Sequence, residues 1–320
     1  MPVYAALDIG SNSVRLLVGQ VEEGRVHPLR QSLRSTRLMA GFGEGRLHPD
    51  AVERTVEGAR ELVAEARAFP LAGMAAVATS AAREAENAGH LLEGLRRATG
   101  LAARIITGEE EALLNYRGVR AGLKAGEGER IVVVDVGGGS TELSWEDRGR
   151  LELRSVPLGA VRCTEVGTPE AAMAEILAPA LREAGREAPF RVVATGGTAT
   201  TLAAVEQGLR EYRPERVHGF VLAREKIRYW RDTLRALPVE ERKKIPGLQP
   251  ERADIIVAGT SLLLEILTGL NAEETTVSEA DLLWGLLLHA AGEVRIGAHC
   301  CSHNRGHRGP LRHKAAPGTP

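Results

Sequence analysis

Residues 3–18, VYAALDIGSNSVRLLV, and residues 130–145, RIVVVDVGGGSTELSW, are two copies of one pattern. Each copy opens with an apolar run typical of a buried strand, which reaches an aspartate, Asp8 or Asp135. A turn of glycine and small hydroxyl residues follows, and then a second alternating run. The repeat predicts the same hairpin twice, and therefore two related domains. Matching positions include Gly10 with Gly137 and Ser13 with Ser140.

The segments after each hairpin predict the same kind of domain. Apolar residues recur at helical spacing over residues 50–69 and 169–185, and short β-rich runs lie between the expected helices. Three strands followed by alternating helices and strands predict an α/β fold, with a mixed β-sheet flanked by helices in each domain. Glycine-rich residues 121–130 are expected to join the domains. The predicted boundaries are 1–124 for domain I, 125–296 for domain II, and 297–320 for a tail.

Composition narrows the classes of function. The hydrophobic fraction of 43% and charged fraction of 26% are those of a soluble globular protein. A net charge of −1 excludes a uniformly basic, DNA-coating surface. The chain has no basic N-terminal leader and no apolar run of about 18 residues, so we expect a cytoplasmic location and no membrane partner. Three cysteines are expected as reduced thiols.

The tail, residues 297–320, differs from the rest of the chain. It has four basic and no acidic residues, and its hydrophobic residues show no period. Its His and Cys residues leave metal binding open, but their spacing follows no clear zinc pattern. We expect a disordered basic segment.

The two hairpin turns suit phosphate. A turn of small residues directly after a strand can aim several backbone N–H groups at one anion. A tight β-turn is the simpler interpretation of one such turn, but two matched copies favour phosphate. The candidate phosphate-binding residues are Ser11, Asn12, Ser13, Gly137, Gly138, Gly139, Ser140 and Thr141. Asp8 and Asp135 would repel phosphate unless a cation lay between, which predicts Mg²⁺ as cofactor and these aspartates as its ligands.

Acidic residues near the domain junction are candidates for activating water. GEEEALLNYRGV, residues 108–119, places three carboxylates at the start of a helix, where acids often only complement the helix dipole. Phosphoanhydride hydrolysis needs a group that orients and deprotonates water. Glu142 directly follows the second turn and is a second candidate.

Two further segments leave alternatives open. Arg83 and Asn87 lie four residues apart on one expected helical face, where Arg83 could bind phosphate or be a solvated charge. The turn in ATGGTATTLA, residues 194–203, could cap a phosphate at a helix N-terminus or be a structural turn.

Taken together, the motifs resemble the exopolyphosphatase and guanosine-pentaphosphate phosphohydrolase family, Ppx/GppA, of the actin-like ATPase superfamily. They run in order along the chain: DIGSNSVR (8–15), ATSAAREAEN (78–87), GEEEALLNYRGV (108–119), DVGGGSTEL (135–143), RVHG (216–219) and RADIIVAG (252–259). The resemblance implies two actin-like (ribonuclease H-like) domains with an active site in the cleft between them. It also implies Mg²⁺ dependence, polyphosphate or guanosine pentaphosphate (pppGpp) as substrate, and a homodimer.

The resemblance also implies roles for single residues. Glu111 matches the catalytic base, with Glu110 as its neighbour, and Glu142 matches the residue that positions the attacking water. Asp135 matches the metal-associated aspartate, and Arg83 matches a phosphate-contacting position, as do the turn residues named above. TTVSEADLLWGL, residues 275–286, lacks the arginine usual in that region of the family.

Two other functions compete with a hydrolase. A phosphotransferase of the sugar or acetate kinase type would share both turns but transfer phosphate to an acceptor other than water. A non-enzymatic ATP-binding switch or filament protein would have no use for Glu111 and Glu142. The pair of glutamates and the segment around Arg83 favour the hydrolase.

Overall fold

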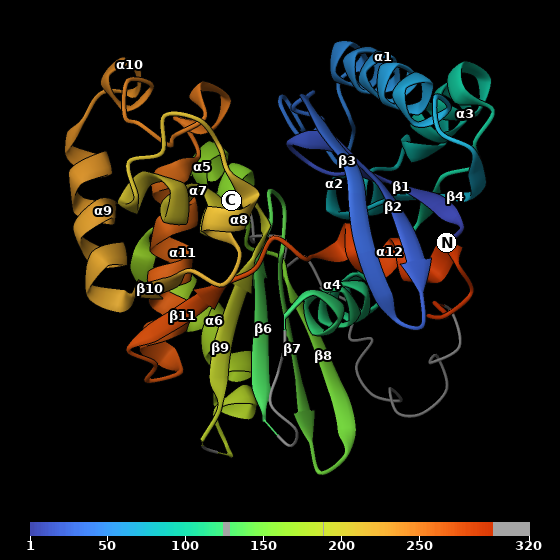
Figure 1. Cartoon of the computed structure of the whole chain (residues 1–320). Coiled ribbons are helices and arrows are strands. Elements are labelled where there is room, and N and C mark those ends of the chain that lie inside the picture. The colour runs from blue at the N-terminus through green and yellow to red at the C-terminus, as the bar shows by residue number, and fades with distance from the viewer. Residues whose placement is uncertain (124–128, 188, 297–320) are drawn as a thin grey trace, which may run out of the picture.

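A computed structural model describes residues 1–123, 129–187 and 189–296, and shows two β-sheets with helices on their faces (Figure 1). The predicted tail and half of the predicted connection, residues 124–128, lie outside the described residues. No helix within the described ranges is long and apolar enough to cross a membrane.

The first sheet is built on the first copy of the repeat. β1 and β2 form the predicted hairpin, β3 extends it, and β4 and β5 add parallel to β1, in the order β3-β2-β1-β4-β5. The strand bounds are β1 Val3–Ile9, β2 Ser13–Glu22, β3 Arg25–Ser35, β4 Leu71–Ala78 and β5 Arg104–Ile105. The helices are α1 Pro49–Ala66, α2 Ser80–Glu84, α3 Ala88–Thr99 and α4 Gly108–Gly122.

The expectation that Arg83 and Asn87 share one helical face is wrong, because α2 ends at Glu84 and α3 begins at Ala88. Asn87 lies between α2 and α3, where its side-chain amide donates to the Leu47 carbonyl at 3.0 Å and its Oδ1 accepts from the Leu47 N–H at 2.8 Å. The asparagine amide carries both donors and an acceptor, so it can pair with the N–H and the C=O of one distant residue.

The second sheet repeats the arrangement and has the order β10-β11-β9-β6-β7-β8. The second copy of the repeat forms the hairpin of β6 and β7, with β8 beside β7 and β9 parallel to β6. The strands are β6 Ile131–Val136, β7 Thr141–Asp147, β8 Arg150–Val156, β9 Arg191–Thr195, β10 Val221–Ala223 and β11 Glu274–Val277. The helices are α5 Ala160–Val166, α6 Glu170–Ala184, α7 Gly196–Glu206, α8 Pro214–Val217, α9 Arg224–Ala236, α10 Val239–Arg242, α11 Ile256–Gly269 and α12 Leu282–Ala290.

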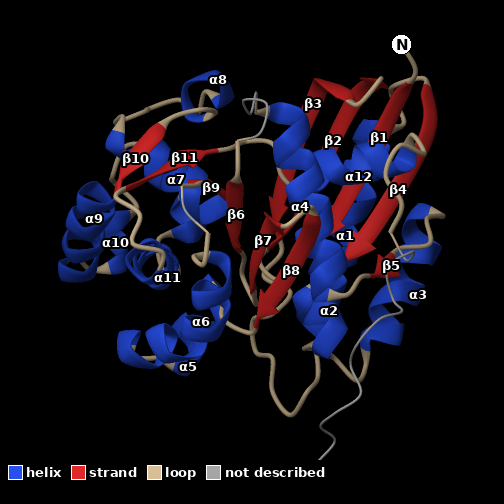
Figure 2. Ribbon diagram, turned by 90° about the horizontal axis from the view of Figure 1, so that it is seen from below, coloured by secondary structure: helices blue, strands red, loops and turns tan. Residues whose placement is uncertain are grey.

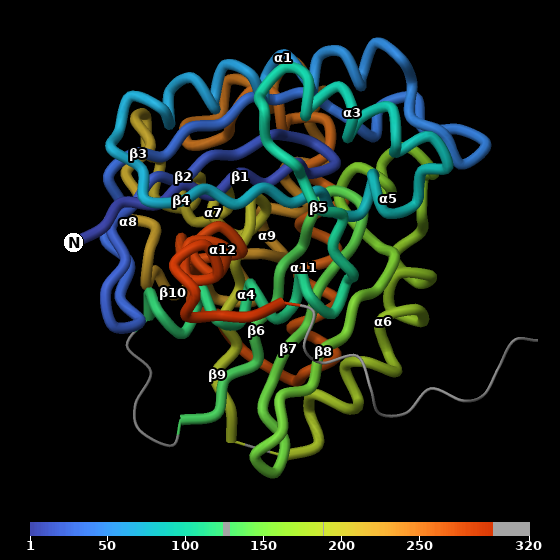
Figure 3. Tube along the Cα trace, turned by 90° about the vertical axis from the view of Figure 1, so that its right-hand side faces the viewer, coloured from blue at the N-terminus to red at the C-terminus, as the bar shows by residue number. Residues whose placement is uncertain are grey.

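Each sheet has a buried core on its outer face. Apolar side chains of α1 and α3, such as Leu62 and Leu91, pack on the first sheet. Those of α6, α7 and α11, such as Leu177 and Leu263, pack on the second. We call the first sheet with α1–α3 the first lobe, and the second sheet with α5–α11 the second lobe. Figure 3 shows α1 and α3 on the side of the first sheet opposite α12.

Helices α4 and α12 fill the space between the lobes (Figure 2). Leu114 of α4 and Leu286 of α12 share a core with Ala6 and Leu17 of the first sheet. On its other side, Tyr116 of α4 belongs to a core with strands of the second sheet. The last described helix therefore packs on the first sheet, although the sequence places it after the second. The boundary predicted at residue 296 stays a prediction.

Candidate active site

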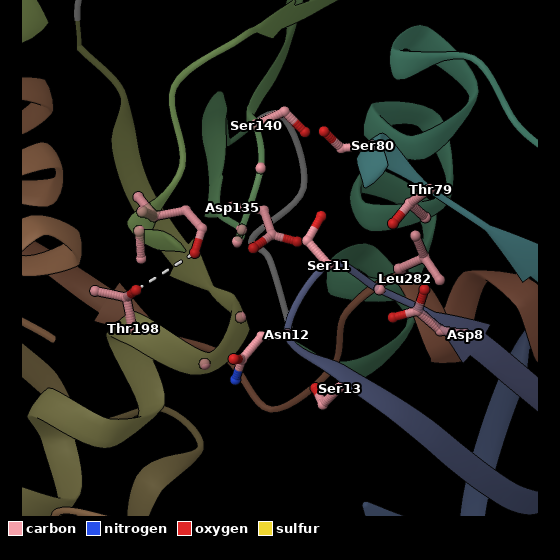
Figure 4. Close-up of a pocket in the computed structure, with 18 of the residues that line it drawn as sticks. Asp8, Ser11, Asn12, Ser13, Thr79, Ser80, Asp135, Ser140, Thr198 and Leu282 are labelled. Atoms are coloured by element: carbon pink, nitrogen blue, oxygen red, sulfur yellow. Dashed lines mark hydrogen bonds between the residues drawn. The ribbon is translucent and has the colours of Figure 1, made fainter. Parts of the chain in front are cut away.

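The two predicted turns have the same structure and face one pocket. The Gly10 N–H donates to the Ser13 carbonyl at 3.0 Å, and the Gly137 N–H donates to the Ser140 carbonyl at the same distance. Each turn follows a strand at its lobe's inner edge, and both line a pocket between the lobes. Figure 4 shows side chains of both turns directed toward this shared space.

Glycine is required where the turns approach each other. A Cβ on Gly138 would lie 3.0 Å from the Cβ of Ser11, which is tighter than ordinary contact. A Cβ on Gly139 would collide with the Ser80 hydroxyl. Backbone from the second lobe therefore lies directly against the first turn, and a larger residue at either position would require neighbouring atoms to shift.

Most of the predicted site residues line this pocket. From the first lobe come Asp8, Ser11, Asn12 and Ser13; from the second come Asp135, Gly137, Gly138, Gly139 and Ser140; and α4 contributes Glu111. Thr141 lies beside the second turn and is fully buried, but its hydroxyl donates to the Leu158 carbonyl at 2.6 Å. That hydroxyl is already used within the protein, so a phosphate contact from Thr141 stays a prediction.

Glu111 and Glu110 are adjacent in sequence but face different environments. Glu110 completes a capping box at the start of α4: its N–H donates to the Thr107 hydroxyl, and its carboxylate accepts from the Thr107 N–H at 3.0 Å. Arg104 also pairs with Glu110 at 2.8 Å. Glu111 is turned inward and is buried. The contacts of Glu110 are those of a helix cap.

Arg83 contacts Glu111. Its Nη1 donates at 3.0 Å both to Glu111 Oε2 and to the Ile106 carbonyl. Burial raises the pKa of Glu111 to about 7, although the Arg83 charge opposes this. A carboxylate with a pKa near neutrality can accept a proton from water. The predicted contact of Arg83 with phosphate stays a prediction.

The matched hairpins differ in what stands opposite each aspartate. Asp8 pairs across the strands with Arg15, and Asp135 occupies the same position opposite Glu142. Arg15 therefore neutralises Asp8, with Nη2 2.7 Å from Asp8 Oδ2. Asp135 instead faces a second acid, so negative charge gathers on the second lobe's side of the pocket.

Burial and neighbouring acids raise the pKa of both carboxyl groups of the second hairpin. Burial raises the pKa of Asp135 to about 6, with Arg15 opposing. The pKa of Glu142 lies well above its usual value, first because it is buried and then because Glu111 and Asp135 are negative. The Ser155 hydroxyl donates to Glu142 Oε1 at 2.7 Å, whereas Glu142 Oε2 is buried without a partner. Such an unpaired buried oxygen costs about 1–3 kcal/mol.

The pocket carboxylates could hold a cation whose remaining ligands come from water and from substrate. Among the described residues, no group of three or more His, Cys, Asp or Glu side chains is arranged to hold a metal. Asp8 Oδ1 is buried without a hydrogen-bond partner, and Asp135 lines the same pocket. One or two carboxylates with waters and phosphate oxygens are enough for a hard divalent ion. The donors present fit such an ion.

Comparison with known proteins identifies the family. The family model for the Ppx/GppA phosphatase family matches residues 17–293. Exopolyphosphatase 2 of Mycobacterium tuberculosis is 33% identical over 315 residues, which cover 90% of this chain and 98% of that protein. The chain belongs to the Ppx/GppA phosphatase family.

Solved Ppx/GppA structures confirm the predicted fold. The family member from Aquifex aeolicus is 34% identical, with a TM-score of 0.75, and the match covers 91% of this chain and 98% of that one. A structure of an exopolyphosphatase from Cytophaga hutchinsonii, 23% identical, has a TM-score of 0.81 over 91% of this chain and 98% of that one. The predicted α/β fold with two actin-like domains is confirmed, as is the resemblance.

Some pocket residues of this Ppx/GppA protein were not assigned a role from sequence. Arg15 and Arg252 both line the pocket, although each lies in a motif quoted above, 8–15 and 252–259. Gly196, Gly197 and Thr198 also line it, so the turn left open above is part of the pocket wall. The positive charge of Arg15, in the same motif as Asp8, was the feature of the sequence that could have pointed to a pairing between them.

The segment that lacks the usual arginine carries an acid that pairs with the pocket residue Arg15. Asp281 forms an ion pair with Arg15, and its Oδ1 accepts from the Leu283 N–H at 2.9 Å as the cap of α12. Arg15 is thus held between Asp8 and Asp281. This segment joins the two lobes, so the ion pair also ties the start of α12 to the first hairpin.

Proposed function

We propose that this chain releases terminal orthophosphate from inorganic polyphosphate with Mg²⁺ as cofactor, in the pocket between the lobes. As a Ppx/GppA phosphatase, the chain is a phosphoanhydride hydrolase. The observation that carries the proposal is that two phosphate-type turns and the inward-facing Glu111 line one pocket. The name of the Mycobacterium tuberculosis relative supports polyphosphate as the substrate.

The two turns would bind the terminal phosphates. Ser11, Asn12 and Ser13 approach from the first lobe, and Gly137 to Ser140 from the second. Backbone N–H groups, hydroxyls and the Arg252 guanidinium supply donors to phosphate oxygens. Binding between the lobes would also exclude bulk water, which strengthens each of these contacts.

Glu111 is the proposed general base. A water held by Glu111 attacks the terminal phosphorus, and the Glu111 carboxylate takes its proton. The bond from that phosphorus to the bridging oxygen breaks, and the shortened chain leaves with the electron pair. Arg83 holds the Glu111 side chain through the bond at 3.0 Å, and Glu142 is proposed to orient the same water. Asp135 and Asp8 would hold Mg²⁺, which supplies neutralisation of phosphate charge when bound.

The pentaphosphate pppGpp is the second candidate substrate, because the same terminal phosphoanhydride could enter the pocket. A phosphotransferase or a non-enzymatic ATP-binding switch would share both turns. Among these, the buried Glu111 with its raised pKa favours transfer to water. A homodimer and a cytoplasmic location complete the proposal, and sedimentation and cell fractionation would test them.

The test is orthophosphate release with Mg²⁺ from long polyphosphate, pppGpp and ATP. Glu111→Gln should reduce turnover by about 10²–10⁴, the usual contribution of a general base. Glu109→Gln is the matched control, because this neighbouring acid is exposed. Glu110→Ala should lower stability through loss of its capping box, and should leave turnover unchanged.

The outcomes separate the candidates. Release from polyphosphate that Glu111→Gln removes and Glu109→Gln keeps supports the proposal. Release from pppGpp alone would change the substrate. ATP that binds but stays intact, with no release from any substrate, would favour a kinase or a switch.

A further inference from the structure

The side chain of Asn115 is buried, yet its polar atoms make no hydrogen bond. It lies on α4 one turn after Glu111, and only 1% of the residue is exposed. Neither Nδ2 nor Oδ1 has a hydrogen-bond partner. An amide that is shielded from water and bonded to nothing destabilises the folded protein, so its presence calls for a ligand or a partner that forms the missing bonds.

The surroundings of Asn115 identify that partner. α4 packs on the second sheet through Tyr116, which shares a core with Val133 of β6. Asp135 lies two residues after Val133 on the same face of β6, so its carboxyl is directed toward α4. No hydrogen bond of normal geometry joins the Asn115 amide to the Asp135 carboxyl.

Other buried oxygens near the same pocket are also unpartnered. Glu142 Oε2, opposite Asp135 in the hairpin, has no hydrogen bond, and neither does Asp8 Oδ1. Thr36, Asp147 and Arg191 also hold unpartnered buried atoms, but Glu142 lies directly opposite Asp135 and Asp8 lines the same pocket as Asp135. A site that gains a cation and ordered water on loading would satisfy the pocket oxygens together.

We propose that Asn115 is a positioning residue for Asp135, donating from Nδ2 to its carboxylate when substrate and cation are bound, while Oδ1 accepts from an ordered water other than the attacking one. This inference rests on the proposed function, in which Asp135 holds the cation. The bond would fix the carboxylate's orientation from behind. Asn115 itself would touch neither phosphate nor the reacting water.

Asn115→Leu is the main test, because leucine has the same branched shape and number of side-chain heavy atoms and removes both unpartnered polar atoms. The full chain should unfold at the same temperature as the parent or higher. Binding of Mn²⁺ to the substrate-free protein, followed by electron paramagnetic resonance, should weaken by about 10–100-fold. The kcat on polyphosphate should fall by a similar factor, with KM little changed.

Two further variants separate the effect on Asp135 from a general effect on folding. Asn115→Ala leaves space for a water that can donate to Asp135, so its Mn²⁺ affinity should lie between those of the parent and Asn115→Leu. If the leucine variant fails to fold, the alanine variant carries the comparison. Thr36→Val is the matched control, because Thr36 Oγ1 is also buried without a partner but belongs to no proposed catalytic group.

Asp135→Asn distinguishes this inference from the function on which it rests. If Asp135→Asn keeps Mn²⁺ binding and turnover, the proposed role of Asp135 is wrong. If Asp135→Asn loses both while a folded Asn115→Leu keeps both, only the inference about Asn115 is overturned.

Discussion

At the scale of single residues, a difference in residue type at one matched position of the two hairpins decides the charge of the pocket. Arg15 and Glu142 occupy the same position in the repeat, opposite Asp8 and Asp135. An arginine makes Asp8 one half of an ion pair, held further by Asp281. A glutamate leaves the second hairpin with two neighbouring buried acids. The same backbone thus builds a neutralised turn in one lobe and an acidic one in the other.

The raised pKa of Glu111 makes a prediction about stability and pH. Its pKa is about 7 in the folded protein and 4.5 ordinarily, so between these values the folded state keeps a proton that the unfolded chain has released. Stability from this group is therefore lost as pH rises from about 4.5 to about 7. Glutamine does not titrate. The free energy of unfolding of Glu111→Gln, minus that of the parent, should increase over this range.

Urea denaturation in EDTA at a series of pH values measures this difference. Glu109→Gln, at an exposed position on the same helix, should show a difference that hardly changes with pH. A difference for Glu111→Gln that is flat, or that decreases with pH, contradicts the assignment of a buried protonated glutamate.

At the scale of elements, α4 organises the site because both lobes pack on it. Its capping box fixes where the helix begins, and the turn of the helix then sends Glu110 outward and Glu111 inward. α12 crosses α4 at glycines: a Cβ on Gly285 would collide with the Leu114 carbonyl, and one on Gly118 with the Asp281 carbonyl. The two helices can approach this closely only without side chains there.

Gly285→Ala should therefore destabilise the protein. Alanine normally stabilises a helix relative to glycine, but here the added methyl meets backbone that cannot rotate away. We expect a loss of about 1–3 kcal/mol, the usual cost of overpacking, measured by thermal or urea denaturation. Gly89→Ala in α3 is the control, since a Cβ there has no heavy atom within 4 Å. Equal effects of the two substitutions would refute the close crossing.

At the scale of the whole molecule, ion pairs join the lobes beside the pocket. Arg162 of the second lobe pairs with Glu84 of the first at 2.5 Å, and also donates to the Gly139 carbonyl at 2.7 Å. Arg37 of the first lobe pairs with Asp254 of the second. These pairs are partly exposed, so each contributes little to overall stability. Their effect should instead be on how closely the lobes sit together.

Removing both pairs should favour more open lobes. The double variant Glu84→Gln with Asp254→Asn should have a larger radius of gyration by small-angle X-ray scattering in the absence of substrate. Its free energy of unfolding should change by less than about 2 kcal/mol, the combined upper value for two exposed pairs. Glu93→Gln removes ion pairs to Arg96 and Arg97 within α3 alone, and should leave the radius unchanged. An unchanged radius in the double variant would show that other contacts keep the lobes closed.

The repeat and the order of elements could be read from sequence because they depend on local patterns. The runs ending at Asp8 and Asp135 have strand periodicity, and a turn of small residues must follow each of them. The resemblance and the fold class followed from several such motifs in order. The interruption by Asn87 was missed, since the cause is a bond to Leu47, a residue forty positions earlier in the chain.

The duplicated hairpin, the two-domain α/β fold and the family could be predicted from the residues alone, because strand periodicity, turn chemistry and ordered motifs are local. Which acids are buried, paired or free depends on how the chain folds in three dimensions. Residue type alone does not show that Glu110 and Glu111 have different environments, nor that Asp8 and Asp135 do. Their differences arise from burial and from partners brought close by folding, such as Arg83, Arg15 and Asp281. Charge interactions depend on distance in space, and that distance exists only once the lobes have packed on α4 and α12.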